Sequence, residues 1–158
     1  MKGNEKILEV LNDLLADELT AVNQYMVHAE MNDDWSYTRL AEVVEKRAID
    51  EMKHAEKLIA RILFLEGTPI VSKYNKINIG AAVEKQFDND WSAEADAIKA
   101  YNDAIKVCCA NNDHGTEQLL KSILKDEEDH IDWLESQKEQ VAQIGIQNYL
   151  GQQIKEEE

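Results

Sequence analysis

The segments "IDEMKHAEKL" (49–58) and "KDEEDHIDWL" (125–134) contain the same short pattern, Asp-Glu-x-x-His. Each places a glutamate three positions before a histidine, as Glu51 with His54 and as Glu127 with His130. Residues three apart share one face of an α-helix, so each pair can act at one place. A single pair means little, because any amphipathic helix can contain one. The repetition is the feature that needs an explanation.

The same spacing relates other polar residues in the two halves of the chain. Glu51 and Glu127 are 76 positions apart, and so are four further pairs: His54 with His130, Glu18 with Glu94, Tyr25 with Tyr101, and Asp50 with Asp126. The halves share little else. Two helix pairs related by a pseudo-twofold axis would bring the six ligand-type residues together at mid-bundle: Glu18, Glu51, His54, Glu94, Glu127 and His130.

Apolar residues recur at steps of three and four along four long segments, which is typical of amphipathic helices. With only 6 Gly and 1 Pro, the chain has few residues that would break them. We predict an all-α, single domain over residues 1–158, with helices at about 4–33, 36–66, 82–111, 115–144 and 146–155. Gly67 is the expected stop of the second helix.

The connections between these helices predict the topology. Residues 32–36 and 111–115 are short polar turns, which make antiparallel neighbours. Residues 67–80 can extend roughly 45–50 Å, about the length of a ~30-residue helix. The prediction is a ferritin-like four-helix bundle with one long crossover and a short fifth C-terminal helix. The apolar face of that last helix (Ile146, Leu150, Ile154) is small, so we expect it to pack against other subunits.

The composition excludes several classes of function. A net charge of −15 with no basic stripe argues against a nucleic-acid partner. No apolar run approaches the ~20 residues of a membrane-spanning helix, and the N-terminus lacks the pattern of a signal peptide. Cys108 and Cys109 are adjacent and form neither a disulfide framework nor a metal clip. A cytoplasmic location is expected.

Four carboxylates buried together would repel one another and could not stay ionised without compensation. Few lysines or arginines lie on these stripes. Two divalent ions would cancel the four charges, and oxygen and nitrogen ligands suit iron or manganese without excluding zinc. Taken singly, each acid is more often a solvated side chain and each histidine a hydrogen-bonded core residue.

Four further residues have two interpretations each. Tyr25 and Tyr101 are either core aromatic residues or hydrogen-bond partners of the ligands, with electron supply as a further role. Asp50 and Asp126 are either solvated acids or residues that help iron to enter or leave.

The sequence resembles the bacterioferritins over nearly its whole length. The matching segments are "MKGNEKILEVLNDLLADELTAVNQY" (1–25), "IDEMKHAEKLIARILFLEGTP" (49–69), "LKDEEDHIDWLE" (124–135) and "IGIQNYLGQQI" (144–154). The resemblance implies a 24-subunit homo-oligomeric cage, built from dimers, that stores ferric mineral. It also implies a ferroxidase centre with two irons per subunit, where Fe(II) is oxidised by dioxygen or peroxide. Glu18 and Glu94 would then be terminal ligands, Glu51 and Glu127 would bridge, and His54 and His130 would each bind one iron.

Met52 has a role only through this resemblance. From its position alone, one residue after Glu51, it points off the bundle's inner face and is an interface or surface residue. The resemblance implies that it ligates haem b, one per subunit pair, through which a small ferredoxin delivers electrons that release iron. The chain departs from some members at Lys46, where a histidine helps to bind iron near Asp50, so an iron site there is not expected.

Three alternatives remain open from the sequence. A haem-free ferritin would have the same chemistry without the role of Met52. A rubrerythrin-like dimetal peroxidase would usually add a cysteine-rich iron module, which this sequence lacks. A non-catalytic helical interaction protein would leave six buried polar ligands unexplained.

Overall fold

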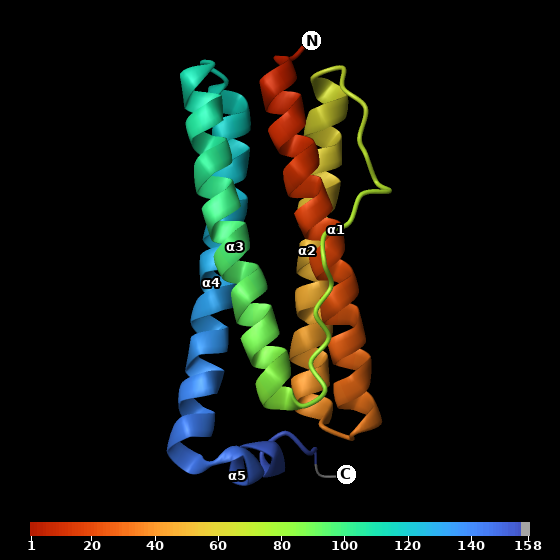
Figure 1. Cartoon of the computed structure of the whole chain (residues 1–158), viewed down its shortest axis with the longest axis vertical. Helices are drawn as coiled ribbons and strands as arrows, with labels where there is room; N and C mark the ends of the chain where they lie inside the picture. The colour runs from red at the N-terminus through yellow and green to blue at the C-terminus, as the bar shows by residue number, and fades with distance from the viewer. Residues whose placement is uncertain (156–158) are drawn as a thin grey trace.

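The computed structural model describes residues 1–155 and is built from α-helices alone within them. The helices are α1 (Glu5–Asp34), α2 (Thr38–Phe64), α3 (Val83–Ala110), α4 (His114–Ile144) and α5 (Ile146–Gly151). The first four form a bundle, and α5 crosses one end of it (Figure 1). The predicted four-helix bundle with one long crossover and a short fifth helix is confirmed.

The interior of the bundle contains two separate apolar clusters. One is built around Leu11, Leu58 and Ile123 and occupies the end near the N-terminus. The other, around Phe87 and Leu134, occupies the end covered by α5. Each of the four long helices therefore passes through an apolar layer, then a polar layer, then a second apolar layer. The six ligand-type residues of the repeat lie in the polar layer, whereas Tyr25 and Tyr101 each belong to one of the apolar clusters.

The crossover runs down the outside of α1 and makes α2 and α3 parallel (Figure 1). Side chains spaced one helical turn apart on α1 accept hydrogen bonds from the backbone of the crossover and hold it in place. Thr20 Oγ1 accepts from Asn75 N at 2.8 Å, Gln24 Oε1 accepts from Asn78 N at 3.0 Å, and His28 Nε2 accepts from Gly80 N at 2.9 Å. These bonds satisfy backbone groups that an extended segment cannot pair with itself.

Three helices end in the same way, with a non-glycine residue in the left-handed conformation. Ser36, Glu66 and Asn112 have φ values of 61°, 61° and 57° and follow α1, α2 and α3. After α2, Glu66 N donates to Leu63 O and Gly67 N donates to Ile62 O, which is a Schellman motif. Gly67 was predicted as the helix stop, but Glu66 takes that position. A Cβ on Gly67 would lie 2.5 Å from Leu8 Cδ2, so its role is close packing.

The C-terminal helix is shorter than predicted and lies against one end of this chain's own bundle. Helix α5 ends at Gly151 rather than near 155, because glycine is a poor helix former and the chain turns there. Ile146 and Leu150 are half-buried against this chain's own bundle, beside the buried Tyr149, and their packing against other subunits stays a prediction. Ile154 remains exposed. The turn places Gln153 O 3.0 Å from Arg39 N, where it caps α2, which lacks a side-chain cap.

Candidate metal centre

The bundle brings the six ligand-type residues together, each from the middle of a long helix. Glu18 comes from α1, Glu94 from α3, and the two Glu-x-x-His pairs from α2 and α4. None of the six residues is more than 4% exposed. They form two overlapping groups, each with its ligand atoms within 4.8 Å of one another. One group is Glu18, Glu51, His54 and Glu127, and the other is Glu51, Glu94, Glu127 and His130.

The two histidines face this cluster with the same ring nitrogen. The carboxylate oxygens nearest to Nδ1 of His54 lie at 3.0 Å (Glu127), 3.3 Å (Glu51) and 3.6 Å (Glu18). Those nearest to Nδ1 of His130 lie at 2.9 Å (Glu51), 3.4 Å (Glu94) and 3.8 Å (Glu127). Glu51 and Glu127 therefore serve both histidines, while Glu18 and Glu94 each serve one. This is the geometry of two adjacent metal positions that share two carboxylates.

Most of the unsatisfied polar atoms in the interior belong to this cluster. Within residues 1–155, six buried side-chain oxygen or nitrogen atoms have no hydrogen-bond partner. Five of them are Glu18 Oε2, Glu51 Oε1, Glu94 Oε2, Glu127 Oε1 and His130 Nδ1. Buried polar atoms without partners are costly and rare in folded proteins. Their concentration at one point, with lone pairs facing one another, fits a donor set for hard or borderline cations.

The pKa values of the cluster show how unfavourable these charges are without metal. Burial and the neighbouring Glu18, Glu127 and Glu94 raise the pKa of Glu51 well above its ordinary value. Burial also raises the pKa of Glu94, with Glu127 as the next cause. Burial lowers the pKa of His54, but the nearby carboxylates of Glu127, Glu18 and Glu51 outweigh this effect, so the net shift is upward. The metal-free cluster therefore tends to hold protons where metal ions would otherwise sit.

The two tyrosines of the repeat contact the outer carboxylates. Tyr25 OH donates to Glu94 Oε1, and Tyr101 OH donates to Glu18 Oε1. Both rings are at most 3% exposed. Burial and the adjacent carboxylates raise both phenol pKa values well above 10, so each hydroxyl stays a donor. The tyrosines thus orient Glu94 and Glu18, with one carboxylate oxygen left free on each.

The two aspartates of the repeat approach the outer ring nitrogens of the histidines. Each aspartate approaches the histidine of the other helix rather than the one on its own helix. Asp126 Oδ2 is 3.0 Å from His54 Nε2, and Asp50 Oδ2 is 3.9 Å from His130 Nε2. A carboxylate on the outer ring nitrogen favours the tautomer that leaves Nδ1 free to ligate. The contact is closer for His54 than for His130, so the two halves are not equivalent.

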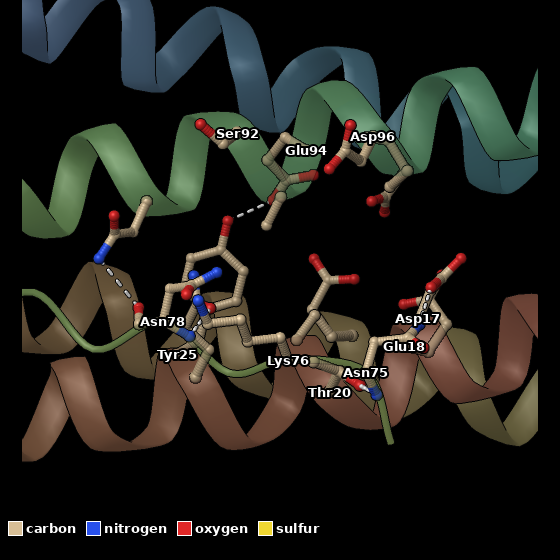
Figure 2. Close-up of a pocket in the computed structure, with 17 residues that line it drawn as sticks. Asp17, Glu18, Thr20, Tyr25, Asn75, Lys76, Asn78, Ser92, Glu94 and Asp96 are labelled. Carbon is tan, nitrogen blue, oxygen red and sulfur yellow. Dashed lines mark hydrogen bonds between the residues drawn. The ribbon is translucent and has the colours of Figure 1, made fainter. Parts of the chain in front are cut away.

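A small cavity of about 140 Å³ leads to the cluster between α1, α3 and the crossover. Figure 2 shows Asp17 and Glu18 on one side, Glu94 and Asp96 on the other, and Asn75 with Lys76 from the crossover. Burial, and then the charge of Glu18, raise the pKa of Asp17 to about 6. The repeat did not point to Asp17 or Asp96, because neither has an acidic counterpart 76 positions away.

Sequence reasoning also missed a buried polar network beside this cavity. Asp90 Oδ1 accepts from Gln24 Nε2 at 2.8 Å, and Asp90 Oδ2 lies 3.1 Å from His28 Nδ1. Since His28 Nε2 accepts from Gly80, its proton lies on Nδ1 and is donated to Asp90. The available signal was the spacing: Asp90 precedes Glu94 by one turn, and His28 follows Tyr25 on the same face.

Comparison with known proteins identifies the family. Residues 8–144 match the ferritin-like domain. A bacterioferritin of Brucella melitensis is 43% identical over 149 residues, which cover 94% of this chain and 92% of that protein. A bacterioferritin of Mycolicibacterium paratuberculosis is 39% identical over 152 residues, covering 96% of each chain. Bacterioferritin BfrA of Mycobacterium tuberculosis is 38% identical with the same coverage.

The chain belongs to the bacterioferritin family. The predicted resemblance is thereby confirmed. Among residues 1–155, no helix combines the length and the apolar character needed to cross a membrane.

The residue that the bacterioferritin resemblance links to haem lies outside the cluster. Met52 is 44% exposed on α2, and Ile49, three residues earlier on the same helical face, is 41% exposed. An accessible thioether beside apolar surface fits one axial ligand of a haem shared with a second copy. Lys46 lies elsewhere on α2, in a groove that also contains Asp50.

Proposed function

We propose that this bacterioferritin-family chain is an iron-storage protein with ferroxidase activity, which uses the buried cluster to oxidise Fe(II). The observation that carries the proposal is the pair of overlapping ligand groups that share Glu51 and Glu127. Four carboxylates and two neutral imidazoles match the charge of two divalent ions. The concentration of unpaired oxygen atoms in this cluster supports a cation substrate rather than an organic one.

The residues of the cluster have distinct roles in the proposed reaction. Glu18 and His54 hold one Fe(II), Glu94 and His130 hold the other, and the shared carboxylates keep the two ions adjacent. Each Fe(II) gives up one electron, and the pair reduces dioxygen with two protons to hydrogen peroxide, or reduces peroxide to water. Tyr25 and Tyr101 keep the terminal carboxylates oriented while the charge on iron changes. The Fe(III) produced leaves the cluster and is deposited as ferric mineral.

The finer parts of the proposal follow from family membership. The chain would assemble into a 24-subunit homo-oligomeric cage built from dimers, with ferric mineral inside, in the cytoplasm. Met52 and its counterpart in a second copy would hold haem b between them. When bound, that haem would supply electrons from a small ferredoxin to reduce stored Fe(III). The exposure of Met52 and Ile49 supports this part of the proposal.

The test is the rate of Fe(II) oxidation, followed by absorbance after Fe(II) is added in air. Glu51→Gln removes a carboxylate that both metal positions share, so we expect fast oxidation to be lost. Glu128→Gln makes the same charge change one residue from Glu127 at an exposed position, so its rate should match the wild type. Equal oxidation rates in Glu51→Gln and in the wild type would show that the cluster does not carry out the oxidation.

A further inference from the structure

A second cavity lies on a different face of the bundle from the one shown in Figure 2. It has a volume of about 490 Å³ and is lined by residues of α2 and α4 alone. The two histidines of the metal cluster, His54 and His130, lie at this groove, together with Trp133. Their Nδ1 atoms face the carboxylate cluster, while their Nε2 atoms approach Asp126 and Asp50, which also line the groove. The groove therefore adjoins the metal centre on the outer side of both histidines.

Positive charge gathers at this groove in a chain that is otherwise strongly acidic. Lys46, Arg47, Lys53 and Lys57 all line it. Three of them follow one stripe of α2, because steps of seven and four residues return to the same face. The chain has 17 basic residues against 32 acidic ones, and seven of the 17 pair with an acid. Yet within residues 1–155 none of these four makes an ion pair within 4.0 Å.

The acids of the groove have other partners. Asp126 contacts His54 Nε2 at 3.0 Å, and Asp129 pairs with Lys125 at 3.0 Å. Arg47 lies over the ring of Trp133, 5.8 Å from its centroid, which holds the guanidinium at the groove. Asp50 lies between Lys46 and Lys53 in sequence, and its nearest basic contact is His130 Nε2 at 3.9 Å. The groove thus presents four basic side chains that have no acid within 4.0 Å, together with three aspartates, of which Asp50 has the longest contact to another charged group.

We propose that this groove binds inorganic phosphate. Lysine and arginine side chains that converge without carboxylate partners recognise a small oxyanion through charge-assisted hydrogen bonds. Asp50 makes phosphate a better ligand than sulfate, because monohydrogen phosphate has an O–H that can donate to a carboxylate and sulfate has none. The same positive charge repels free Fe(II), so the groove is not itself a second iron site.

The position of the proposed phosphate site, beside the metal cluster, indicates a role in accepting ferric iron. Phosphate held here lies beside His54 and His130, and its oxygens are hard ligands that suit Fe(III). It would meet ferric iron as the iron leaves the cluster on the α2 and α4 side. This last step rests on the proposed ferroxidase function, whereas the binding of phosphate does not.

Calorimetric titration of the iron-free protein with inorganic phosphate at neutral pH tests the proposal. We expect saturable binding, with sulfate clearly weaker. Lys46→Gln together with Lys57→Gln should weaken the binding by about tenfold or more, the effect of losing one or two charge-assisted contacts. The matched control is Lys106→Gln together with Lys121→Gln, two exposed lysines paired with acids on α3 and α4, which should leave the affinity unchanged.

Three outcomes would overturn the proposal: no binding above that of chloride, equal loss of affinity in the control variant, or sulfate bound as tightly as phosphate. Since iron is absent from the titration, a negative result is distinct from a failure of the ferroxidase proposal. If phosphate binds, Fe(II) oxidation followed with and without phosphate tests its effect on iron transfer. The double variant should lose any phosphate-dependent acceleration while it keeps the rate measured without phosphate.

Discussion

Replacing Glu94 by glutamine should stabilise the metal-free protein and weaken its response to metal. Glu94 is 2% exposed, and its Oε2 has no hydrogen-bond partner. In the metal-free cluster four carboxylates face two imidazoles, so even two imidazolium ions would leave two negative charges uncompensated. Glutamine keeps the shape of the side chain and an oxygen that can accept from Tyr25, but it removes one of these charges.

The expected magnitude follows from the cost of an unpaired buried polar group. Relieving it is worth about 1–3 kcal/mol, and for a chain of this size each kcal/mol changes Tm by about 2–4 °C. The gain depends on pH. Because the pKa of Glu94 is raised on folding, its protonated form stabilises the fold at low pH, and that stability is lost as the pH rises above the ordinary value of 4.5. The advantage of Glu94→Gln should therefore be larger at pH 8 than at pH 5.

Scanning calorimetry of chelator-treated protein, with and without anaerobic Fe(II), measures both effects. Wild-type protein should gain about 2.7 kcal/mol for each metal position at a metal concentration one hundred times Kd, and Glu94→Gln should gain less because it has lost a ligand. Glu128→Gln is the control for a general charge effect, since this side chain is exposed. A Glu94→Gln protein that is less stable without metal, or that gains as much from Fe(II) as the wild type, would refute the reasoning.

Three further predictions concern other parts of the chain. Ser36→Gly should raise the free energy of unfolding by about 1 kcal/mol, because Ser36 holds a φ of 61° that glycine adopts without cost; thermal unfolding against Ser36→Ala, which should bring no gain, measures it. Asp17→Asn should raise Tm at pH 8 but not at pH 4, since a pKa of about 6 in the fold, against an ordinary 3.8, means that stability is lost as the pH rises through this range. After allowance for its partial exposure, the gain is roughly 1–2 kcal/mol, and an equal gain at both pH values would contradict the assignment. Met52→Leu should abolish the Soret band of protein purified with haem and leave Fe(II) oxidation unchanged, while a retained Soret band would remove Met52 as a ligand.

The sequence was sufficient for the cluster because its members obey a repeat. Glu18, Glu51 and His54 recur 76 positions later, and each interrupts an apolar stripe at the depth where the helices meet. A helical period and two short turns were enough to place them together. The limits of the four long helices also came within about two residues of those observed.

The parts that escaped prediction depend on contacts between segments far apart in the chain. Glu66 and Ser36 take the left-handed position that sequence rules give to glycine, because the hydrogen bonds of the motif outweigh the steric cost. The pairing of His28 with Asp90 joins α1 to α3; helical spacing places each residue on an inner face but does not encode which partner it meets. The end of α5 depends on the start of α2, where the uncapped Arg39 N–H group donates to Gln153 O.

The central claim is that two adjacent metal positions share Glu51 and Glu127. The most direct test is anomalous X-ray scattering at the iron edge from crystals loaded anaerobically with Fe(II). The account predicts two iron peaks per chain inside the bundle, one beside His54 Nδ1 and Glu18 and one beside His130 Nδ1 and Glu94, with the shared carboxylates between them. Crystals saturated with iron that show no peak in the polar layer between the two apolar clusters would contradict it.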